Sequence, residues 1–351
     1  MVIKPTFGNQ ISIDYIESIG DYILFTEKEP WSILKNELKN QPKKVIYNDS
    51  MDFIKLNKLY DSAQALLHPD TSIVGIGGGT ICDTAKFFAW RFRDEEQKGI
   101  NLILIPSIIS VDAFLCSSIA VREHSKVRYM GDISPKKIII DFDLIQRGPK
   151  ELNRAGISDV ISITSALGDW KLARDEINER FDHNVFQKAK NIVHDLMSET
   201  EEISEVSEKG ITILVNCLYE EVKLCENWGN SRPEEGSEHF LGYCLEYITK
   251  ARYIHGNLIG MTVLVSLLLQ EEYAEFLLDN IMNFFENIKI KVAPKYQNIK
   301  LNEIILALKQ IKQFIIEENL PFSIYHSNKL KLNRKKIKSV IKLLKSLNKN
   351  Q

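Results

Sequence analysis

The sequence of 351 residues is poor in cysteine and has no C-x-x-C pair. An odd, scattered set of cysteines argues against a disulfide framework and favours a reducing compartment. The first ten residues, MVIKPTFGNQ, lack the apolar segment of a signal peptide. We therefore expect a cytoplasmic protein with free thiols. The five cysteines are Cys82, Cys116, Cys217, Cys225 and Cys244.

Long apolar runs and strong net charge are also missing. The longest apolar run, MTVLVSLLL at 261–269, falls short of the roughly 20 residues that a membrane span needs. A formal net charge of −2 gives no electrostatic reason to expect a nucleic-acid partner. The C-terminal stretch KLKLNRKKIKSVIKLLKSLN is basic and amphipathic, a pattern that can bind membrane surfaces. We favour a docked terminal helix with a solvated lysine face, and expect no stable membrane insertion and no nucleic acid.

The first part of the chain alternates short apolar runs with segments of helical period, as βαβ units do. The runs are apolar throughout, which is typical of strands covered on both faces. We expect an α/β domain with a doubly wound, mostly parallel, Rossmann-like sheet. The expected strands are 22–26, 44–47, 72–76, 101–105 and 137–141, and the expected helices are 30–38, 52–67 and 80–92.

The rest of the chain has no convincing strand and reads as an all-α helical domain. Gly148 and Pro149 end one pattern just before the next begins, which places the boundary there. The sequence therefore predicts an α/β domain at 1–148 and a helical domain at 149–351. The expected helices are 151–174, 184–197, 204–227, 236–249, 257–286, 302–317 and 331–346.

A glycine turn, Gly77-Gly78-Gly79-Thr80, joins the third expected strand to a helix. Glycines let a ligand approach the backbone closely, and a helix N-terminus offers amide groups to a phosphate. The usual G-x-G-x-x-G fingerprint is incomplete, because Thr80 stands where the third glycine belongs. The turn therefore indicates either a phosphate site or a tight turn without a ligand.

A second polar segment, PSIISVDAFLCSS, follows the next expected strand. Ligands of open α/β sheets bind at the carboxyl ends of the strands. Ser107, Ser110 and Asp112 therefore suit a cofactor or substrate, and the alternative is a serine-rich turn in which Asp112 caps a helix. Asp49, which follows the second expected strand, is a candidate for the adenosine ribose; an ordinary turn is the alternative.

Histidine is scarce in the helical domain, and two histidines stand at breaks before helices. His239 follows NWGNSRPEEGSE, and His255 precedes an apolar helix. With Asp159 they offer one carboxylate and two imidazoles, a set that catalytic zinc sites use. The spacings match no local metal motif, so an ordinary core or surface role remains the alternative.

Taken together, these segments resemble the iron-containing alcohol dehydrogenase / dehydroquinate synthase superfamily, and within it the sn-glycerol-1-phosphate dehydrogenase branch. The stretches that carry the resemblance span residues 72–260, and the family's total length also fits. GGGxxxDxAK marks the superfamily, whereas SRPxxGSEH and DWKLA point to the branch. The matching stretches are GIGGGTICDTAK, PSIISVDAFLCSS, PKKIIIDFDLI, AGISDVISITSALGDWKLA, NSRPEEGSEH and HGNLIG.

The resemblance implies a dehydroquinate synthase-like fold, NAD or NADP as cofactor, and one divalent metal, Zn²⁺ by default. Asp159, His239 and His255 would bind the metal, and Asp112 would face the substrate. A homo-oligomer is expected as well. The residues implied on the cofactor side are Gly77, Gly78, Gly79, Thr80, Asp83, Ser107 and Ser110.

Three residues depart from the family pattern. Tyr243 stands where the family has a second histidine near the substrate, Cys116 replaces a serine of the cofactor loop, and Asn257 replaces a glutamate. None of the three is a metal ligand. The change at Tyr243 bears on the substrate and the proton relay, because this residue lies one helical turn after His239.

The expected activity is hydride transfer between NAD(P)H and dihydroxyacetone phosphate, giving sn-glycerol 1-phosphate. A phosphorylated small-molecule substrate needs a cationic partner, and the candidates are Lys171, Arg232 and Arg252. Two enzyme alternatives are a glycerol dehydrogenase-like enzyme acting on an unphosphorylated polyol and a dehydroquinate synthase-like sugar-phosphate cyclase. The non-enzyme alternative is a binding protein that keeps the fold.

Overall fold

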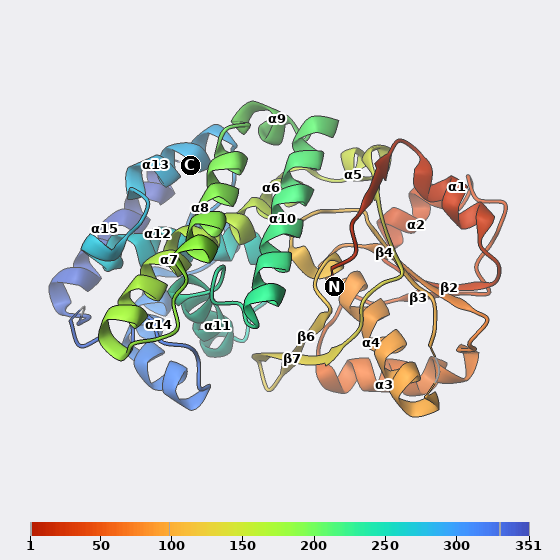
Figure 1. The fold of residues 1–351 in the computed structure, drawn as a ribbon, viewed down its shortest axis with the longest axis horizontal. Helices are drawn as coiled ribbons and strands as arrows, with labels where there is room; N and C mark the ends of the chain where they lie inside the picture. The colour runs from red at the N-terminus through yellow and green to blue at the C-terminus, as the bar shows by residue number, and fades with distance from the viewer. Residues whose placement is uncertain (1, 98, 330, 351) are drawn as a thin grey trace. The chain divides into compact units, whose positions relative to one another are not determined.

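The computed structural model describes residues 2–97, 99–329 and 331–350. The chain forms two compact units, one ending at Asn153 and the other beginning at Arg154 (Figure 1). Asn153 belongs to unit 1 through its side chain, which accepts a hydrogen bond from the Ile109 amide at 3.0 Å and donates one to the Ile145 carbonyl at 3.0 Å.

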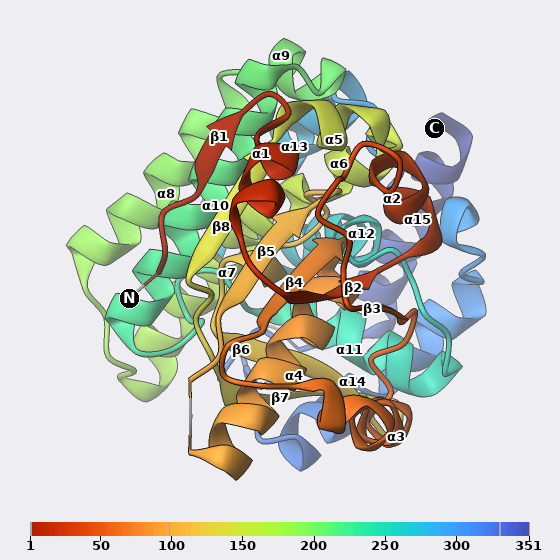
Figure 2. The same cartoon turned by 90° about the vertical axis from the view of Figure 1, so that its right-hand side faces the viewer.

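Unit 1 is built on a six-stranded sheet in which every pairing is parallel. The doubly wound α/β domain expected from the sequence is thus confirmed, with all five expected strands. Figure 2 shows β8, β5 and β4 as neighbours in this sheet. The strands, in spatial order, are β1 (Thr6–Gly8), β8 (Lys137–Asp141), β5 (Leu102–Pro106), β4 (Ser72–Gly77), β2 (Tyr22–Thr26) and β3 (Lys44–Tyr47).

Helices cover both faces of the sheet, which is why its strands are apolar throughout. On one face, Leu24 of β2 packs with Ile16 of α1 (Ile11–Ser18) and Leu34 of α2 (Lys28–Leu34). The next residue of β2, Phe25, points to the other face and contacts Phe88 of α4 (Gly79–Glu96), with ring centroids 4.5 Å apart. α3 (Phe53–Ala63) packs on the same side through Tyr60, whose ring lies 5.1 Å from that of Phe88.

Three strands of unit 1 were missed from the sequence. β1 has only three residues, too few for a pattern. The other two form an antiparallel hairpin, β6 (Ser118–Glu123) and β7 (Lys126–Asp132). Its two turn residues, His124 and Ser125, have φ of 51° and 63° and so occupy the left-handed region without the Asn-Gly or Asp-Gly that normally signals such a turn.

Unit 2 consists of helices, and no strand follows Pro149 among the described residues, as expected. Several of the long helices expected from the sequence are interrupted. Val206, which is in the left-handed region, separates α9 (Thr200–Glu205) from α10 (Glu208–Trp228). Glu271, with φ of 52°, follows the end of α12 (His255–Gln270). α5 (Phe142–Arg147) ends unit 1 and α6 (Lys150–Ala155) spans the boundary. The others are α7 (Ile157–Ile177), α8 (His183–Met197), α9 (Thr200–Glu205), α10 (Glu208–Trp228), α11 (Ser237–Thr249), α12 (His255–Gln270), α13 (Leu278–Asn287), α14 (Leu301–Glu317) and α15 (Arg334–Asn350).

α7 and α12 form the centre of unit 2. Residues 157–170 of α7 and 256–267 of α12 are all buried, and the two helices pack against each other. Trp170 of α7 is fully buried against Trp228 of α10, with ring centroids 5.0 Å apart. No helix in the described part of the chain is both long enough and apolar enough to span a membrane.

Candidate metal and cofactor sites

The first metal candidate, Asp159, lies in the opening turn of α7, just after Gly156. A carboxylate is favoured in the first turn of a helix, where it meets the positive end of the helix dipole. The side chain of Asp159 is 4% exposed. A buried charged carboxylate needs a cationic partner or a metal.

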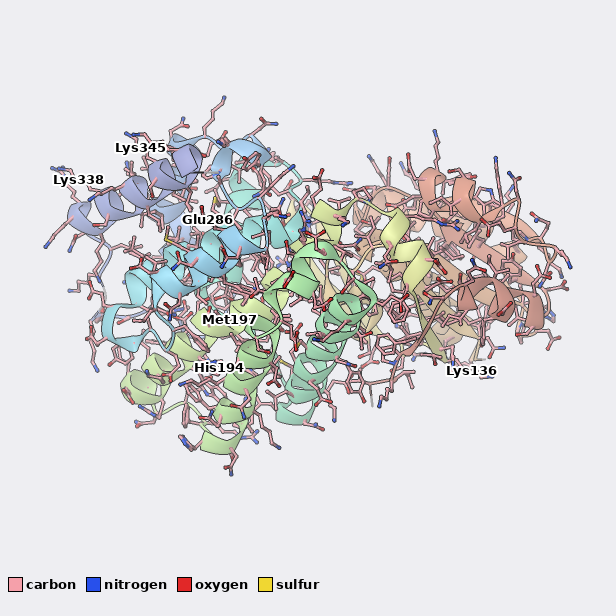
Figure 3. The ribbon with its side chains drawn as sticks, turned by 90° about the horizontal axis from the view of Figure 1, so that it is seen from above. Lys136, His194, Met197, Glu286, Lys338 and Lys345 are labelled. Carbon is pink, nitrogen blue, oxygen red and sulfur yellow. The ribbon has the colours of Figure 1, made fainter. Side chains whose placement is uncertain are left out.

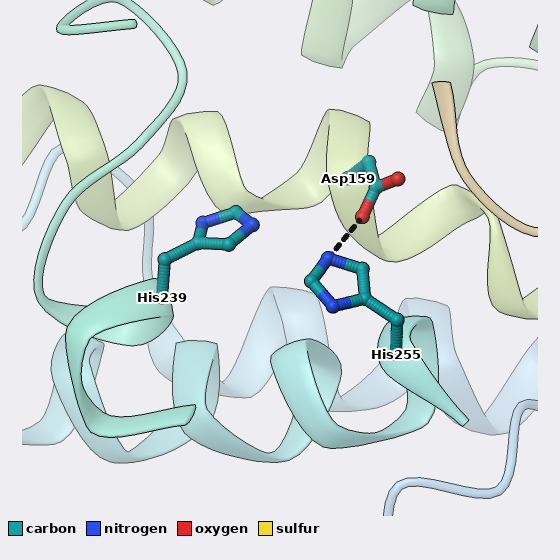
Figure 4. Close-up of side chains that lie close together, drawn as sticks. All are labelled: Asp159, His239 and His255. Atoms are coloured by element: carbon teal, nitrogen blue, oxygen red, sulfur yellow. Dashed lines mark ion pairs between the residues drawn. The ribbon is translucent and has the colours of Figure 1, made fainter. Parts of the chain in front are cut away.

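His239 and His255 reach Asp159 from the starts of α11 and α12 (Figure 4). His255 Nε2 lies 3.4 Å from Asp159 Oδ1, and the two imidazole centroids are 5.4 Å apart. Gly256 makes this approach possible, because a Cβ there would lie 1.8 Å from the Ala155 carbonyl oxygen. The close approach of the start of α12 to Ala155, just before α7, therefore depends on the glycine next to His255.

The three ligand atoms all lie within 4.8 Å of one another. Zinc ligands about 2.1 Å from a shared ion in tetrahedral geometry stand roughly 3.4 Å apart. The Asp159–His255 distance of 3.4 Å already has this value. One carboxylate and two imidazoles thus fit a divalent ion with little rearrangement, although their spacing along the chain gave only a weak signal.

Glu238 fixes the orientation of His239. Its Oε1 lies 2.9 Å from His239 Nδ1, which leaves Nε2 as the ligand atom. Glu238 is fully buried and also accepts hydrogen bonds from Ser165 Oγ at 2.6 Å and the Gly236 amide at 2.6 Å. A carboxylate behind a ligand histidine is a common support in metal sites, and sequence reasoning missed it, because Glu238 in GSEH was read only as part of a family motif.

Carboxylates make the surroundings of His239 strongly favourable for a cation. Burial alone lowers the pKa of His239, but the hydrogen bond with Glu238 and the charges of Glu235, Glu238 and Glu234 outweigh burial and raise the pKa to about 10. The same negative field that stabilises a proton on the imidazole would stabilise a divalent ion in its place.

Asp169 is a second buried carboxylate that sequence reasoning passed over. It lies in the DWKLA segment of α7, and its two oxygens accept from the Ser237 amide at 2.6 Å and the Ile324 amide at 2.8 Å. Burial and the charge of Glu238 raise the pKa of Asp169 to about 6. Asp169 thereby ties the start of α11, and with it His239, to α7.

Tyr243 lies beside the metal candidates, as its spacing predicts. Its ring centroid is 5.8 Å from that of His239, and its hydroxyl donates to Glu235 Oε1 at 2.8 Å. Asn257, two residues after His255, is buried, and its Oδ1 has no hydrogen-bond partner among the described residues. A buried, unpartnered oxygen indicates a ligand or a water molecule at that place.

The glycine turn of unit 1 joins β4 to α4. A Cβ at Gly77 would lie 2.5 Å from Ile81, and one at Gly79 would lie 2.5 Å from Val111, so both positions need glycine for packing. A Cβ at Gly78 would meet nothing within 4 Å. The space beside Gly78 and the first amides of α4, which have no acceptor within the helix, fit a phosphate group.

The position of the turn in the sheet also suits a nucleotide. The chain runs from β2 outward to β3 and then returns to β4 on the other side of β2, which is a topological switch point. Ser107, at the end of the neighbouring strand β5, has a buried Oγ with no hydrogen-bond partner among the described residues. This orphaned hydroxyl lies next to the turn, since the Ser107 amide donates to the Gly77 carbonyl at 3.0 Å.

Other cofactor-side candidates surround this turn in unit 1. Asp83 forms a buried ion pair with Lys86 at 2.7 Å, and Lys86 also donates to the Cys116 carbonyl at 3.0 Å, which holds the Cys116 segment to α4. Ser110 and Asp112 are half-buried in the loop that packs on Gly79 through Val111. Thr80 is half-buried in the first turn of α4.

A carboxylate not singled out from the sequence lies at the glycine turn as well. Glu27 follows β2, and it accepts a hydrogen bond from the Gly78 amide. Burial raises the pKa of Glu27, and the charges of Glu29 and Asp49 add to this effect. Asp49 itself is exposed after β3. Glu27 and Asp49 thus lie near enough to influence each other at the carboxyl ends of β2 and β3.

Arg232 and Lys171, two candidate phosphate partners, form ion pairs within unit 2. Arg232 is buried and pairs with Glu179, Nε to Oε1 at 2.8 Å. Lys171 pairs with Glu275 at 3.0 Å. Arg252 is exposed, three residues before His255.

Comparison with known proteins supports the resemblance seen in the motifs. Residues 23–149 match the family model of the iron-containing alcohol dehydrogenases. The chain is 28% identical over 238 residues to a glycerol-1-phosphate dehydrogenase (NAD(P)+) of Thermoplasma volcanium, a match that covers 68% of this chain and 65% of the relative. The matched region therefore spans slightly less than two thirds of that relative.

Solved structures share the fold over nearly the whole chain. A probable glycerol dehydrogenase from Sinorhizobium meliloti superposes with a TM-score of 0.69 at 14% identity, covering 97% of this chain and 95% of that one. A 2-deoxy-scyllo-inosose synthase superposes with a TM-score of 0.59 at 17% identity, covering 87% and 85%. The expected fold class is confirmed, and the chain is similar to glycerol-1-phosphate dehydrogenases and to the iron-containing alcohol dehydrogenase family model.

Proposed function

We propose that this protein is a metal- and NAD(P)-dependent dehydrogenase that interconverts dihydroxyacetone phosphate and sn-glycerol 1-phosphate. The observation that carries the proposal is the approach of Asp159, His239 and His255 to within 4.8 Å in a chain similar to glycerol-1-phosphate dehydrogenases. The largely buried position of these three side chains and the carboxylates around His239 favour a bound cation over a chance grouping of side chains that holds no ion.

Each ligand residue has a defined part in holding the metal, for which Zn²⁺ is the default. Asp159 would supply negative charge to the ion, and His239 and His255 would supply neutral nitrogens, the ligand types that catalytic zinc sites use. Glu238 keeps His239 in the required tautomer. When bound, the ion supplies Lewis-acid catalysis at the substrate oxygen, and the nicotinamide gives or takes the hydride.

The cofactor is assigned to unit 1. The first amides of α4 donate hydrogen bonds to the pyrophosphate at the glycine turn, with Gly78 leaving room for it. The orphaned hydroxyl of Ser107 is the next contact, with Ser110 on the nicotinamide side. Asp49 hydrogen-bonds the ribose, and because a carboxylate repels a 2′-phosphate, NAD is favoured over NADP.

On the substrate side, Tyr243 takes the role of a hydrogen-bonding and proton-relaying group. Its hydroxyl already donates to Glu235, which gives it a route for passing a proton. The family resemblance assigns Asp112, in the loop after β5, to the substrate side. Arg252 is the candidate partner of the substrate phosphate, since its guanidinium matches phosphate oxygens in pairs.

The engagement of Arg232 and Lys171 in internal ion pairs favours a second candidate, an alcohol dehydrogenase acting on an unphosphorylated polyol. The variant Arg252→Gln separates the two candidates. A phosphorylated substrate predicts a higher KM for dihydroxyacetone phosphate in Arg252→Gln and an unchanged KM for dihydroxyacetone.

The proposal is tested by following NADH and NADPH oxidation with dihydroxyacetone phosphate, dihydroxyacetone and a cyclisable sugar phosphate. We expect turnover with the first substrate, and identification of the product as the sn-1 phosphate would complete the assignment. Turnover of only the second would establish the polyol dehydrogenase, and phosphate release without net NADH oxidation would establish a cyclase.

The cellular compartment and the oligomeric state of the enzyme are also part of the proposal. No disulfide joins any of the five cysteines, which suits the reducing cytoplasm. We also expect a homo-oligomer, as the family resemblance implies. Size-exclusion chromatography with light scattering measures this state directly, and a monomer at micromolar concentration would contradict it.

A further inference from the structure

The charge of the chain is distributed very unevenly. The last 33 residues, from Asn319 on, hold nine of the 45 lysines and arginines and none of the 47 aspartates and glutamates. The formal net charge of −2 therefore conceals an acidic body and a basic terminal segment. Such asymmetry is typical of a segment that meets an anionic partner.

The basic segment ends in α15, which is docked on unit 2 by its apolar face. Val340, Leu344 and Leu347 are buried, and the helix packs against α12 and α14. Lys336, at the edge of the docked face, pairs with Glu271 at 3.2 Å. The favoured expectation of a docked terminal helix is thus met, and the apolar face is not available for insertion into a bilayer.

The opposite face of α15 carries an unbroken row of cations. They recur at spacings of four, four, three and four residues, which keeps them on one side of a helix. All are exposed, and none has an ion pair among the described residues. Figure 3 shows two of them, Lys338 and Lys345, on the outer side of α15. This lysine stripe consists of Arg334, Lys338, Lys342, Lys345 and Lys349.

An ordinary solvated helix face does not need this arrangement. Like charges one turn apart repel and destabilise the helix, whereas opposite charges support it. α10 shows the ordinary pattern, with Lys223 paired to Glu220 at 3.3 Å. The lysine stripe has repulsion at every step over a length of about 22 Å, at 1.5 Å per residue. An anionic partner would relieve that repulsion.

We propose that the lysine stripe adsorbs the protein to the surface of an anionic lipid bilayer. Lysine ammonium groups on one straight face suit a diffuse, planar negative surface, which attracts each nearby cation about fivefold. A groove for single-stranded nucleic acid would call for aromatic side chains between the cations, and residues 331–350 contain none. Adsorption through this face leaves the apolar face of α15 docked, so the protein binds without inserting.

The test is sedimentation of the full chain with phosphatidylcholine vesicles, with and without phosphatidylserine. The variant reverses three charges of the stripe, Lys338→Glu, Lys342→Glu and Lys345→Glu. A matched control reverses three exposed lysines of α8 and α14, and so changes net charge equally: Lys188→Glu, Lys309→Glu and Lys312→Glu.

We expect binding only to the phosphatidylserine vesicles, reduced at least about a hundredfold in the stripe variant and much less in the control. Binding should disappear near 1 M salt, where charges are screened within about 3 Å. Circular dichroism checks that the stripe variant is folded. We expect it to be, because the charge reversals relieve repulsion between neighbouring lysines in α15. Equal losses in both variants, no vesicle binding by the wild type, or stripe-dependent binding to duplex DNA alone would each overturn the proposal.

Discussion

Replacement of Gly78 by valine isolates the cofactor function of the glycine turn from its structural function. Gly78 has φ of −80° and ψ of −167°, an extended conformation that valine adopts readily. Because a Cβ there would meet nothing within 4 Å, the variant should fold normally. Gly77 offers no such separation, since a Cβ there would clash with Ile81 at 2.5 Å.

The size of the effect follows from the phosphate contacts that valine blocks. A hydrogen bond to a charged group contributes about 1.5–3 kcal/mol, so the loss of two weakens binding by about 3–6 kcal/mol. That corresponds to roughly a 10²- to 10⁴-fold increase in the Kd of NADH. Binding of NADH should therefore become undetectable in a fluorescence titration at ordinary concentrations.

Gly20→Val is the matched control. Gly20, like Gly78, has no atom within 4 Å of an added Cβ, but it precedes β2 and so lies at the opposite end of the parallel strands from the turn. It should bind NADH as the wild type does, and both variants should keep the wild-type metal content. If Gly78→Val binds NADH with unchanged affinity, the turn does not contact the cofactor, and the reasoning fails.

Three further predictions concern unit 2. Glu238→Gln keeps the shape of the side chain behind His239 but removes its charge, so we expect zinc affinity to fall about 10- to 100-fold in a chelator competition. The control, Glu286→Gln at an exposed position, should bind zinc as the wild type does. Asp169 has its folded-state pKa raised from 3.8 to about 6, so the folded state holds the proton more tightly and stability falls as pH rises through this range. Relative to Asp169→Asn, the wild type should lose up to about 3 kcal/mol of unfolding free energy between pH 4 and pH 7 in urea titrations; parallel curves would show that Asp169 is not shifted. Tyr243→Phe should retain metal and lower kcat for the ketone about 10²-fold or more, and an unchanged kcat would remove Tyr243 from the proton relay.

The sequence predicts the features that depend on local chemistry. The strand Ser72–Gly77, the glycine turn and α4 follow from an apolar run, three glycines and a helical period, and the structure has them in that order. His239 and His255 stand out because each lies at a break before a helix. Their convergence on Asp159 is a tertiary fact, and only the family resemblance made it a firm expectation.

The features that escaped prediction depend on contacts between distant segments. The hairpin turn at His124 and Ser125 lacks a turn signature, and its left-handed residues are held by pairing of the strands on either side. Glu238 and Asp169 read as ordinary charged residues until folding buries them together. Only then does one carboxylate orient His239 while the other holds the start of α11.

The central claim is that a divalent ion held by Asp159, His239 and His255 is required for the dehydrogenase reaction. The most direct measurement is the rate of NADH oxidation with dihydroxyacetone phosphate as Zn²⁺ is added back to chelated protein, in the wild type and in His255→Ala. The account predicts no rate without metal, a rate that saturates at about one ion per chain in the wild type, and little rate at any loading in the variant. An undiminished rate in metal-free protein, or equal rates in the two proteins, would contradict it.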